Sequence, residues 1–202
     1  MEIYIKINNK EIPLTNEQVK EIQQSFGITN TKLADITVGE TFKIGEHEFI
    51  VLEHSKETTA VILKDLLFER NEFGKTNNYK SSYVDKVCNE FANTISNIIG
   101  SENLIEHTVD LIADDGLKEY GTIKRRMSLL TANLYRRYVE ILDNHKIGQW
   151  WWLATAYSTQ KHENANWVKC VSPCGDIYDA SYGNYYGVRP FCILNSNIFV
   201  SK

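Results

Sequence analysis

"GQWWWLATAYST", residues 148–159, places three tryptophans side by side and follows them with small and hydroxylated residues. In a β-strand, alternate residues face opposite sides, so Trp150 and Trp152 would share one face while Trp151 takes the other. A strand with one face in water would leave apolar indole surface exposed, at a free-energy cost of about 25 cal/mol per Å² of apolar area. The stretch therefore predicts an interior strand that is covered by helices on one face and by loops on the other.

The composition is that of a globular chain without a strong charge. Its 202 residues, 43% hydrophobic and 24% charged, suit one domain with an appendage or two small domains. The net charge of -4 provides no broad positive field, so we expect neither nucleic acid nor a membrane as partner. The N-terminus lacks the features of a signal peptide, and no apolar run reaches the roughly 20 residues of a membrane span. These features favour a cytoplasmic protein.

Four cysteines, Cys88, Cys170, Cys174 and Cys192, fit a reducing compartment. Cys170 and Cys174 have the spacing C-x3-C, but no neighbouring Cys or His pair completes a zinc site. We expect buried thiols, with a disulfide and metal binding as the alternatives. The sequence predicts no cofactor.

Residues 1–30 read as a small unit, a β-hairpin followed by a helix. "EIYIKI" alternates apolar and other residues as a strand does, and "EIPLT" returns as a second strand. Thr15 and Gln18 form a capping box that opens a helix over 16–27. The apolar face of this helix consists of Val19, Ile22 and Phe26. Such a unit cannot bury much surface alone, so it must dock on the remainder or on another chain, which leaves a homo-oligomer through this segment open.

The rest of the chain predicts strands at both ends and helices in the middle, an α+β fold. Strands over 38–44 and 47–53 flank a two-residue turn, and "TTAVIL", 58–63, is a third strand. A helix is expected before Gly100. Its apolar positions are Val84, Val87, Phe91, Ile95 and Ile98. Two short strand-like pieces follow, around the acidic turn "ADDG".

A second helix begins at the cap residue Thr131, and the final third of the chain is strand and loop. The apolar stripe of that helix is Leu134, Tyr138, Ile141 and Leu142. In "GVRPFCIL", 187–194, alternation places Val188, Cys192 and Leu194 on one side and Arg189, Phe191 and Ile193 on the other. We expect this strand to lie beside the tryptophan strand, with Pro190 at an edge or a bulge. Arg189 then needs a carboxylate or several carbonyls, which favours a structural tie over a ligand contact.

Four stretches together carry a family resemblance: "MSLLTANLYRRY", "WWWLATAYS", "WVKCVSPCGDI" and "YGVRPFCIL". They resemble an uncharacterised domain family of Gram-positive bacteria and their phages, with a WWL-type strand and a closing GVRP. The order of elements is also similar to C-type-lectin-like folds, which include formylglycine-generating enzymes and the variable tip proteins of diversity-generating retroelements. The resemblance implies a C-type-lectin-like domain over 36–202, with residues 1–30 as an appendage. In such folds the two ends meet in a small sheet, and an irregular region above it binds the ligand.

No catalytic signature is present in the sequence. G-x-S-x-G, the P-loop, G-x-G-x-x-G and H-E-x-x-H are all missing. Asp110, Asp114 and Asp115 lack the alternation of a calcium loop and read as a solvated turn. We therefore expect a protein that is not an enzyme and holds no metal.

"CGDIYDASYGNYYG", 174–187, is dense in Tyr, Asn, Asp, Ser and Gly, a mixture typical of binding loops. The alternative is a polar hairpin whose tyrosines only cover the sheet. The predicted partner contacts are Tyr157, Trp167, Tyr178, Asp179, Tyr182, Asn184 and Tyr185, with His162 at their border.

The leading functional hypothesis is a non-enzymatic recognition module, encoded by a phage or mobile element, that binds a protein or glycan through these C-terminal loops. One alternative is an intracellular phage-encoded inhibitor or regulator of a host defence system. The others are a divergent enzyme of the formylglycine-generating type and a structural component of the phage particle.

Overall fold

The tryptophan stretch forms the middle strand of a sheet in the computed structural model, which describes residues 3–7, 10–15, 18, 30–162 and 164–202. Strand β12 (Trp151–Ala156) lies at the centre of a five-stranded sheet of order β14-β13-β12-β15-β7. Its neighbours are β13 (Trp167–Val171), β14 (Ile177–Ser181), β15 (Tyr185–Val188) and β7 (Phe68–Glu72). Every residue of β12 is buried. The prediction of an interior strand is confirmed.

The two faces of β12 are covered differently. Trp152 packs against Phe73, in the loop after β7, and against Tyr186 of β15, with ring centroids 5.5 and 4.7 Å away. Its indole N–H donates to the carbonyl of Asn71 at 2.8 Å, so the buried polar atom is satisfied. On the other face, Trp151 meets the edge of Tyr135 in the short helix α3 (Ala132–Arg137). A helix therefore covers the Trp151 face, as expected. Trp152, on the other face, belongs to the main core cluster, which also includes residues of the helix Tyr83–Ile99, so loops alone do not cover that face.

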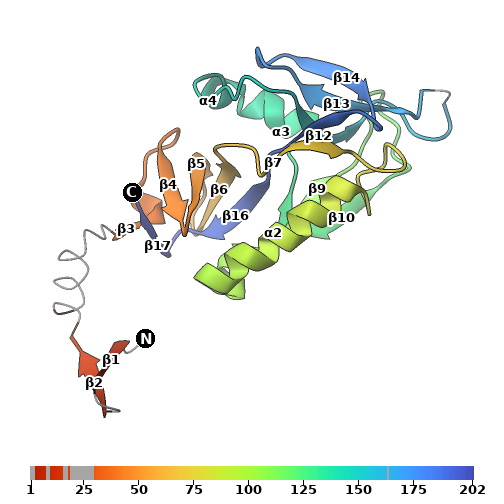
Figure 1. The fold of residues 1–202 in the computed structure, drawn as a ribbon. Helices are drawn as coiled ribbons and strands as arrows, with labels where there is room; N and C mark the ends of the chain where they lie inside the picture. Colours follow the sequence, from red (N-terminus) through yellow and green to blue (C-terminus); the bar gives the residue numbers. More distant parts are fainter. Residues whose placement is uncertain (1–2, 8–9, 16–17, 19–29, 163) are drawn as a thin grey trace.

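A second sheet has eight strands (Figure 1), and residues of both sheets contribute to each of the two core clusters. Its order is β11-β16-β6-β5-β4-β17-β3, and β8 also pairs with β16. The strands are β3 (Asn30–Lys32), β4 (Thr41–Ile44), β5 (His47–His54), β6 (Thr58–Leu63), β8 (Leu104–Ile105), β11 (Met127–Ser128), β16 (Phe191–Asn195) and β17 (Phe199–Ser201). β5 and β6 confirm the predicted strands, whereas the strand predicted over 38–44 begins only at Thr41, because residues 37–40 form a turn in which the Glu40 amide donates to the Thr37 carbonyl. Because β3 pairs with β17, the two ends of this part of the chain meet in one sheet.

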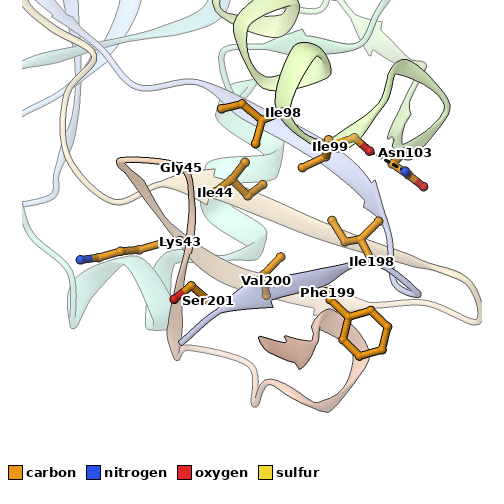
Figure 2. A pocket seen from close by; sticks show the side chains of 10 residues that line it. All are labelled: Lys43, Ile44, Gly45, Ile98, Ile99, Asn103, Ile198, Phe199, Val200 and Ser201. Atoms are coloured by element: carbon orange, nitrogen blue, oxygen red, sulfur yellow. Dashed lines mark hydrogen bonds between the residues drawn. The ribbon is translucent and has the colours of Figure 1, made fainter. Parts of the chain in front are cut away.

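The main helix, α2 (Tyr83–Ile99), lies against the eight-stranded sheet. Ser82 caps it by accepting a hydrogen bond from the Asp85 amide, and Gly100, with φ of 86°, ends it as predicted. Ile98 does not lie in the core, contrary to the prediction, since it is 51% exposed. There Ile98 borders an open hollow that is also lined by Gly45 and Phe199 (Figure 2).

The second predicted helix starts at its cap, where Thr131 Oγ1 accepts from the Leu134 amide, but it breaks at Tyr138. The chain continues as α4 (Val139–Asp143). At the break the Tyr138 hydroxyl donates to Glu53 Oε2 of β5 at 2.7 Å. The fold is thus mixed α+β, mostly strands with one main helix.

"GVRPFCIL" is not one strand, contrary to the prediction. β15 ends at Val188 in the five-stranded sheet, and β16 begins at Phe191 in the eight-stranded sheet. Arg189 and Pro190 carry the chain from one sheet to the other. Proline cannot donate to a ladder, which explains why pairing stops there.

The smaller elements complete the chain. β1 (Ile3–Ile7) and β2 (Lys10–Leu14) form the predicted antiparallel hairpin, and Thr15 and Gln18 make both hydrogen bonds of the capping box. The helix predicted over 16–27, with Val19, Ile22 and Phe26, lies outside the described residues except for Gln18. The remaining elements are β9 (His107–Asp110), its partner β10 (Thr122–Arg125), and two 3-10 turns, Leu33–Asp35 and Ser101–Asn103. Among the described residues, no helix has the length and apolar character that a membrane crossing requires.

Candidate functional site

The segment 174–187, which contains most of the predicted contacts, does not form a hairpin. β14 pairs with β13 at one edge of the sheet, whereas β15 lies on the far side of β12 and pairs with β12 and β7. Two strands, β13 and β12, therefore separate Tyr178 and Asp179 from Tyr185. The turn residues between β14 and β15 indicate where these strands end, but they do not determine which neighbouring strand each of them pairs with.

Alternation along β14 divides the predicted residues further. Asp179 stands opposite Lys169 of β13, and Tyr178 stands opposite Cys170. Since successive side chains point to opposite faces, Asp179 and Tyr178 belong to different surfaces. Two separate candidate surfaces result, which we call the ionic hollow and the tyrosine patch.

The ionic hollow is lined by Tyr157, Asn164, Trp167 and Asp179, and its volume is about 380 Å³. Three of these four residues are among the predicted contacts. Trp167 begins β13 and is 43% exposed, so its indole is available to a ligand. The sequence does not predict Asn164 as a contact.

A charged network reaches the hollow through Asp179. Lys169 Nζ lies 2.8 Å from Asp114 Oδ2, 2.8 Å from Asp179 Oδ1 and 5.2 Å from the ring centre of Tyr157. Arg136 also donates to Asp114 Oδ1, at 3.2 Å. Lys169 is not predicted, although it shares a strand face with Trp167, and that alternation is the signal that could have identified it.

Asp114 is thus more than part of a solvated turn, contrary to the prediction. Its amide donates to the carbonyl of Ala156 at 2.9 Å, and the amide of Asp115 donates to the carbonyl of Tyr157 at 3.2 Å. These bonds hold the acidic turn against the end of β12. Asp110 lies at the end of β9, away from the lining of the hollow.

The network keeps its charges fixed at neutral pH. Burial lowers the pKa of Lys169, but its hydrogen bonds to Asp114 and Asp179 outweigh burial and raise the pKa above its ordinary value. Burial raises the pKa of Asp114, and the hydrogen bonds from Lys169 and Arg136 outweigh it and lower that pKa. An ammonium group held by two carboxylates is poorly suited to act as a base or nucleophile. The hollow therefore offers two aromatic side chains, Tyr157 and Trp167, and two polar ones, Asn164 and Asp179, for binding.

The tyrosine patch lies on the other side of the sheet and consists of Trp150, Tyr178 and Tyr186. The Trp150 ring stacks on Tyr186 and meets Tyr178 edge-on, both at 5.4 Å between centroids. Tyr185 is exposed and donates its hydroxyl to Glu72 Oε1. An open hollow of about 510 Å³ borders the patch and is also lined by Glu69 and Arg70.

The last three predicted residues have structural partners. Tyr182 is partly buried and packs on the core, as a residue that covers the sheet would. Asn184 donates to the Tyr186 hydroxyl at 3.3 Å, and His162 Nδ1 lies 3.4 Å from Asp115 Oδ2. His162 therefore adjoins the acidic turn beside the ionic hollow.

The cysteines are free thiols. Cys88, Cys170 and Cys192 are buried, as expected, whereas Cys174 is exposed. Burial raises the pKa of Cys88 and of Cys170 to about 12, so both remain protonated at neutral pH. Among the described residues, no three His, Cys, Asp or Glu side chains are grouped to hold a metal ion.

The fold and this surface define a mixed α+β protein with a hollow lined by aromatic and polar side chains. No protein-family model matches the chain, and no curated protein or solved structure is significantly similar to it.

Proposed function

We propose that this protein is a non-enzymatic recognition module that binds a protein or glycan partner in the ionic hollow. The single observation that carries the proposal is the hollow itself, which Trp167 and Tyr157 line together with Asp179 of the Asp114–Lys169–Asp179 network. Its volume of about 380 Å³ lies within the range of small-ligand sites, and it suits a group that projects from a larger partner, such as a sugar ring or a side chain. Aromatic rings provide contact area at low entropy cost, while fixed polar groups orient what they bind.

We further propose that the domain is a variant of the C-type-lectin-like fold and belongs to the WWL…GVRP family of Gram-positive bacteria and their phages. The pairing of β3 with β17 supports this, because the ends of such domains meet in a sheet. The buried central position of β12 also supports it. A phage or mobile-element origin is part of the same proposal.

The test compares Trp167→Ala with Tyr178→Ala, a control on the opposite surface. Both side chains are aromatic and about half exposed, so neither change should affect the melting temperature. Binding would be measured on a glycan array and by pull-down from host lysate, with any captured partner then purified and titrated. We expect Trp167→Ala to weaken binding about 30-fold, the effect of removing an interface hot spot of about 2 kcal/mol, and Tyr178→Ala to bind normally.

The remaining outcomes contradict the assignment in different ways. If Tyr178→Ala alone loses the partner, the tyrosine patch is the contact surface. If both variants bind as the unsubstituted protein does, neither surface is the site. Binding to a sugar on the array identifies a glycan ligand, and a titratable complex with one host protein identifies a protein ligand.

A further inference from the structure

Strand β14 lies at one end of the five-stranded sheet, and its outer edge pairs with no other strand among the described residues (Figure 1). Such an edge can pair with a strand of another chain, and proteins usually protect it by charges, bulges or short length. β14 pairs with β13 over five residues without a bulge, and its one charged residue, Asp179, is held by Lys169 of the same chain. The other ends of the two large sheets are better protected, since β3 has three residues, β11 has two, and β7 has three charged side chains.

Hydrogen bonds at the two ends of β14 show which of its residues face outwards. The Ser172 amide donates to the Asp176 carbonyl at 2.8 Å, and the Tyr182 amide donates to the Asn166 carbonyl at 3.0 Å. Both bonds continue the register in which β14 pairs with β13. Hydrogen-bonded and non-hydrogen-bonded pairs alternate in an antiparallel ladder. The even-numbered residues of β14 therefore direct their backbone groups to β13, and the odd-numbered residues direct theirs outwards.

Two residues on this edge have both backbone groups free. Within the part of the chain that the structure describes, the amides and carbonyls of Ile177 and Asp179 make no outward hydrogen bond. The Ser181 carbonyl already accepts a hydrogen bond from the turn that follows β14. Before β14, both backbone groups of Gly175 are bonded within the chain. A strand that pairs with this edge therefore finds a complete donor and acceptor at Ile177 and at Asp179.

This pattern matches itself, because two free residues that are separated by one residue can pair with the same two residues of an antiparallel copy. We propose that two copies of this protein associate by antiparallel pairing of β14 with β14, about a two-fold axis at Tyr178. Ile177 of each copy then lies opposite Asp179 of the other copy, and each such pair exchanges two backbone hydrogen bonds. The contact uses all of the free groups, and its symmetry closes the assembly at two copies.

The side chains favour this register over its neighbour. An axis at Asp179 would place two carboxylates directly opposite each other, which is destabilising. In the proposed register Asp179 lies opposite an isoleucine and keeps its ion pair with Lys169. Tyr178, which is 52% exposed, lies opposite Tyr178 of the other copy, and aromatic pairs across strands are favourable.

The size of the contact determines its strength. One five-residue strand from each copy is less than a standard interface of about 1,600 Å² provides. We therefore expect a dimer that dissociates on dilution. The association is independent of the proposed recognition function, because the backbone groups of the edge form it.

Disulfide cross-linking tests the register. Tyr178→Cys is made in a Cys174→Ser background, which removes the exposed native thiol. Opposite residues of a non-hydrogen-bonded pair have Cα atoms about 4.5 Å apart, within the range of about 4.4–6.8 Å that a disulfide requires. Mild oxidation should therefore convert Tyr178→Cys into a covalent dimer, measured on a non-reducing gel.

Tyr185→Cys in the same background is the matched control. Tyr185 is 55% exposed, close to the value for Tyr178, but it lies on β15 inside the sheet. We expect the covalent dimer of Tyr178→Cys to form at least about ten times faster, because pairing holds its thiols at a high effective concentration. Equal rates for the two variants would overturn the proposal, since random collision would then explain both.

The unsubstituted protein provides a second measurement, sedimentation velocity from about 10 µM to about 1 mM. The mean mass should rise from that of a monomer towards that of a dimer. Ile177→Pro removes an outward N–H and no bond to β13, so it should stay monomeric, with its fold checked by circular dichroism. An unsubstituted protein that is monomeric throughout this range would overturn the proposal. A dimer that survives in folded Ile177→Pro would overturn it too, because another surface would then form the contact.

Discussion

Arg189 is the buried charge on which the junction of the two sheets depends. It is 1% exposed, and its guanidinium donates to the carbonyls of Leu63, Lys64 and His145 at 2.9, 2.8 and 3.3 Å. Its centre lies 5.3 Å from the Trp151 ring. Burial lowers its pKa to about 10, so it still carries its charge at neutral pH. The prediction of a structural tie to several carbonyls is confirmed.

Arg189→Lys should lower the free energy of unfolding by about 3 kcal/mol, because a single ammonium group cannot reach all three carbonyls and unpaired buried acceptors cost about 1–3 kcal/mol each. Urea denaturation measures this. Arg136→Lys, at an exposed arginine, is the control and should change stability by less than about 1 kcal/mol. Equal effects of the two substitutions would contradict the role of Arg189.

The sequence indicates that Arg189 needs hydrogen-bond acceptors, but it does not indicate which residues provide them. A buried arginine beside a tryptophan strand requires acceptors, and Pro190 next to it indicates a break in the pairing. The acceptors belong to residues 63, 64 and 145, which are distant in the chain. Only the packing of the two sheets brings them together.

At the scale of elements, helix α2 is anchored to β10 by one buried ion pair. Arg125 donates to both carboxylate oxygens of Asp85, through Nε and Nη2, each at 2.7 Å. Asp85 is almost fully buried and also accepts hydrogen bonds from the Ser81 amide and from Asn89. This pair fixes the first turn of α2, whose apolar face then packs on the sheet.

Removing Arg125 alone should lower the free energy of unfolding more than removing both Arg125 and Asp85. Arg125→Ala leaves a buried carboxylate without its cation and should cost about 3–5 kcal/mol. The double variant Asp85→Ala/Arg125→Ala removes that charge and should recover part of the loss. Chemical denaturation of both variants provides the measurement, and a double variant less stable than Arg125→Ala would argue against the pair as the source of the loss.

Local patterns predicted the elements better than their pairing. The apolar period and Gly100 indicate α2, and the turn at Gly45 indicates the β4–β5 hairpin. The pairing of Trp151 with Gly187 confirms that the start of the GVRP segment lies beside the tryptophan strand. The parallel direction of this pairing is non-local, and nothing near either residue specifies it. For the same reason the sequence predicted Tyr157, Trp167 and Asp179 as contacts by their chemistry, but did not separate them from Tyr178 and Tyr185.

At the scale of the whole molecule, a buried histidine makes stability depend on pH. His107 Nε2 lies 3.0 Å from Ser128 Oγ, and the ring meets Phe191 edge-on. Burial lowers its pKa from 6.5 to about 4. Between these values the unfolded chain takes up a proton that the folded protein does not. The stability that neutral His107 contributes is therefore complete above about pH 6.5 and is lost as the pH falls towards 4.

His107→Phe should remove this dependence while keeping an aromatic ring in place. In the unsubstituted protein, the free energy of unfolding should fall by up to about 3 kcal/mol between pH 6.5 and 4. Urea denaturation at several pH values in this window would show a smaller slope for the variant. His162→Ala, at an exposed histidine, should keep the original slope. Identical slopes for all three proteins would assign the effect to other groups.

The pairing of β17 with both β3 and β4 has a consequence for synthesis in the cell. Residue 201 must leave the ribosome before the β3–β17 ladder can form. At a translation rate of about 5–20 residues per second, some ten to thirty seconds pass between the synthesis of β3 and that of residue 201. During that interval β4 presents an open edge with unpaired backbone groups, which can pair with a neighbouring nascent chain. Production of this protein should therefore depend on chaperones that protect incomplete chains.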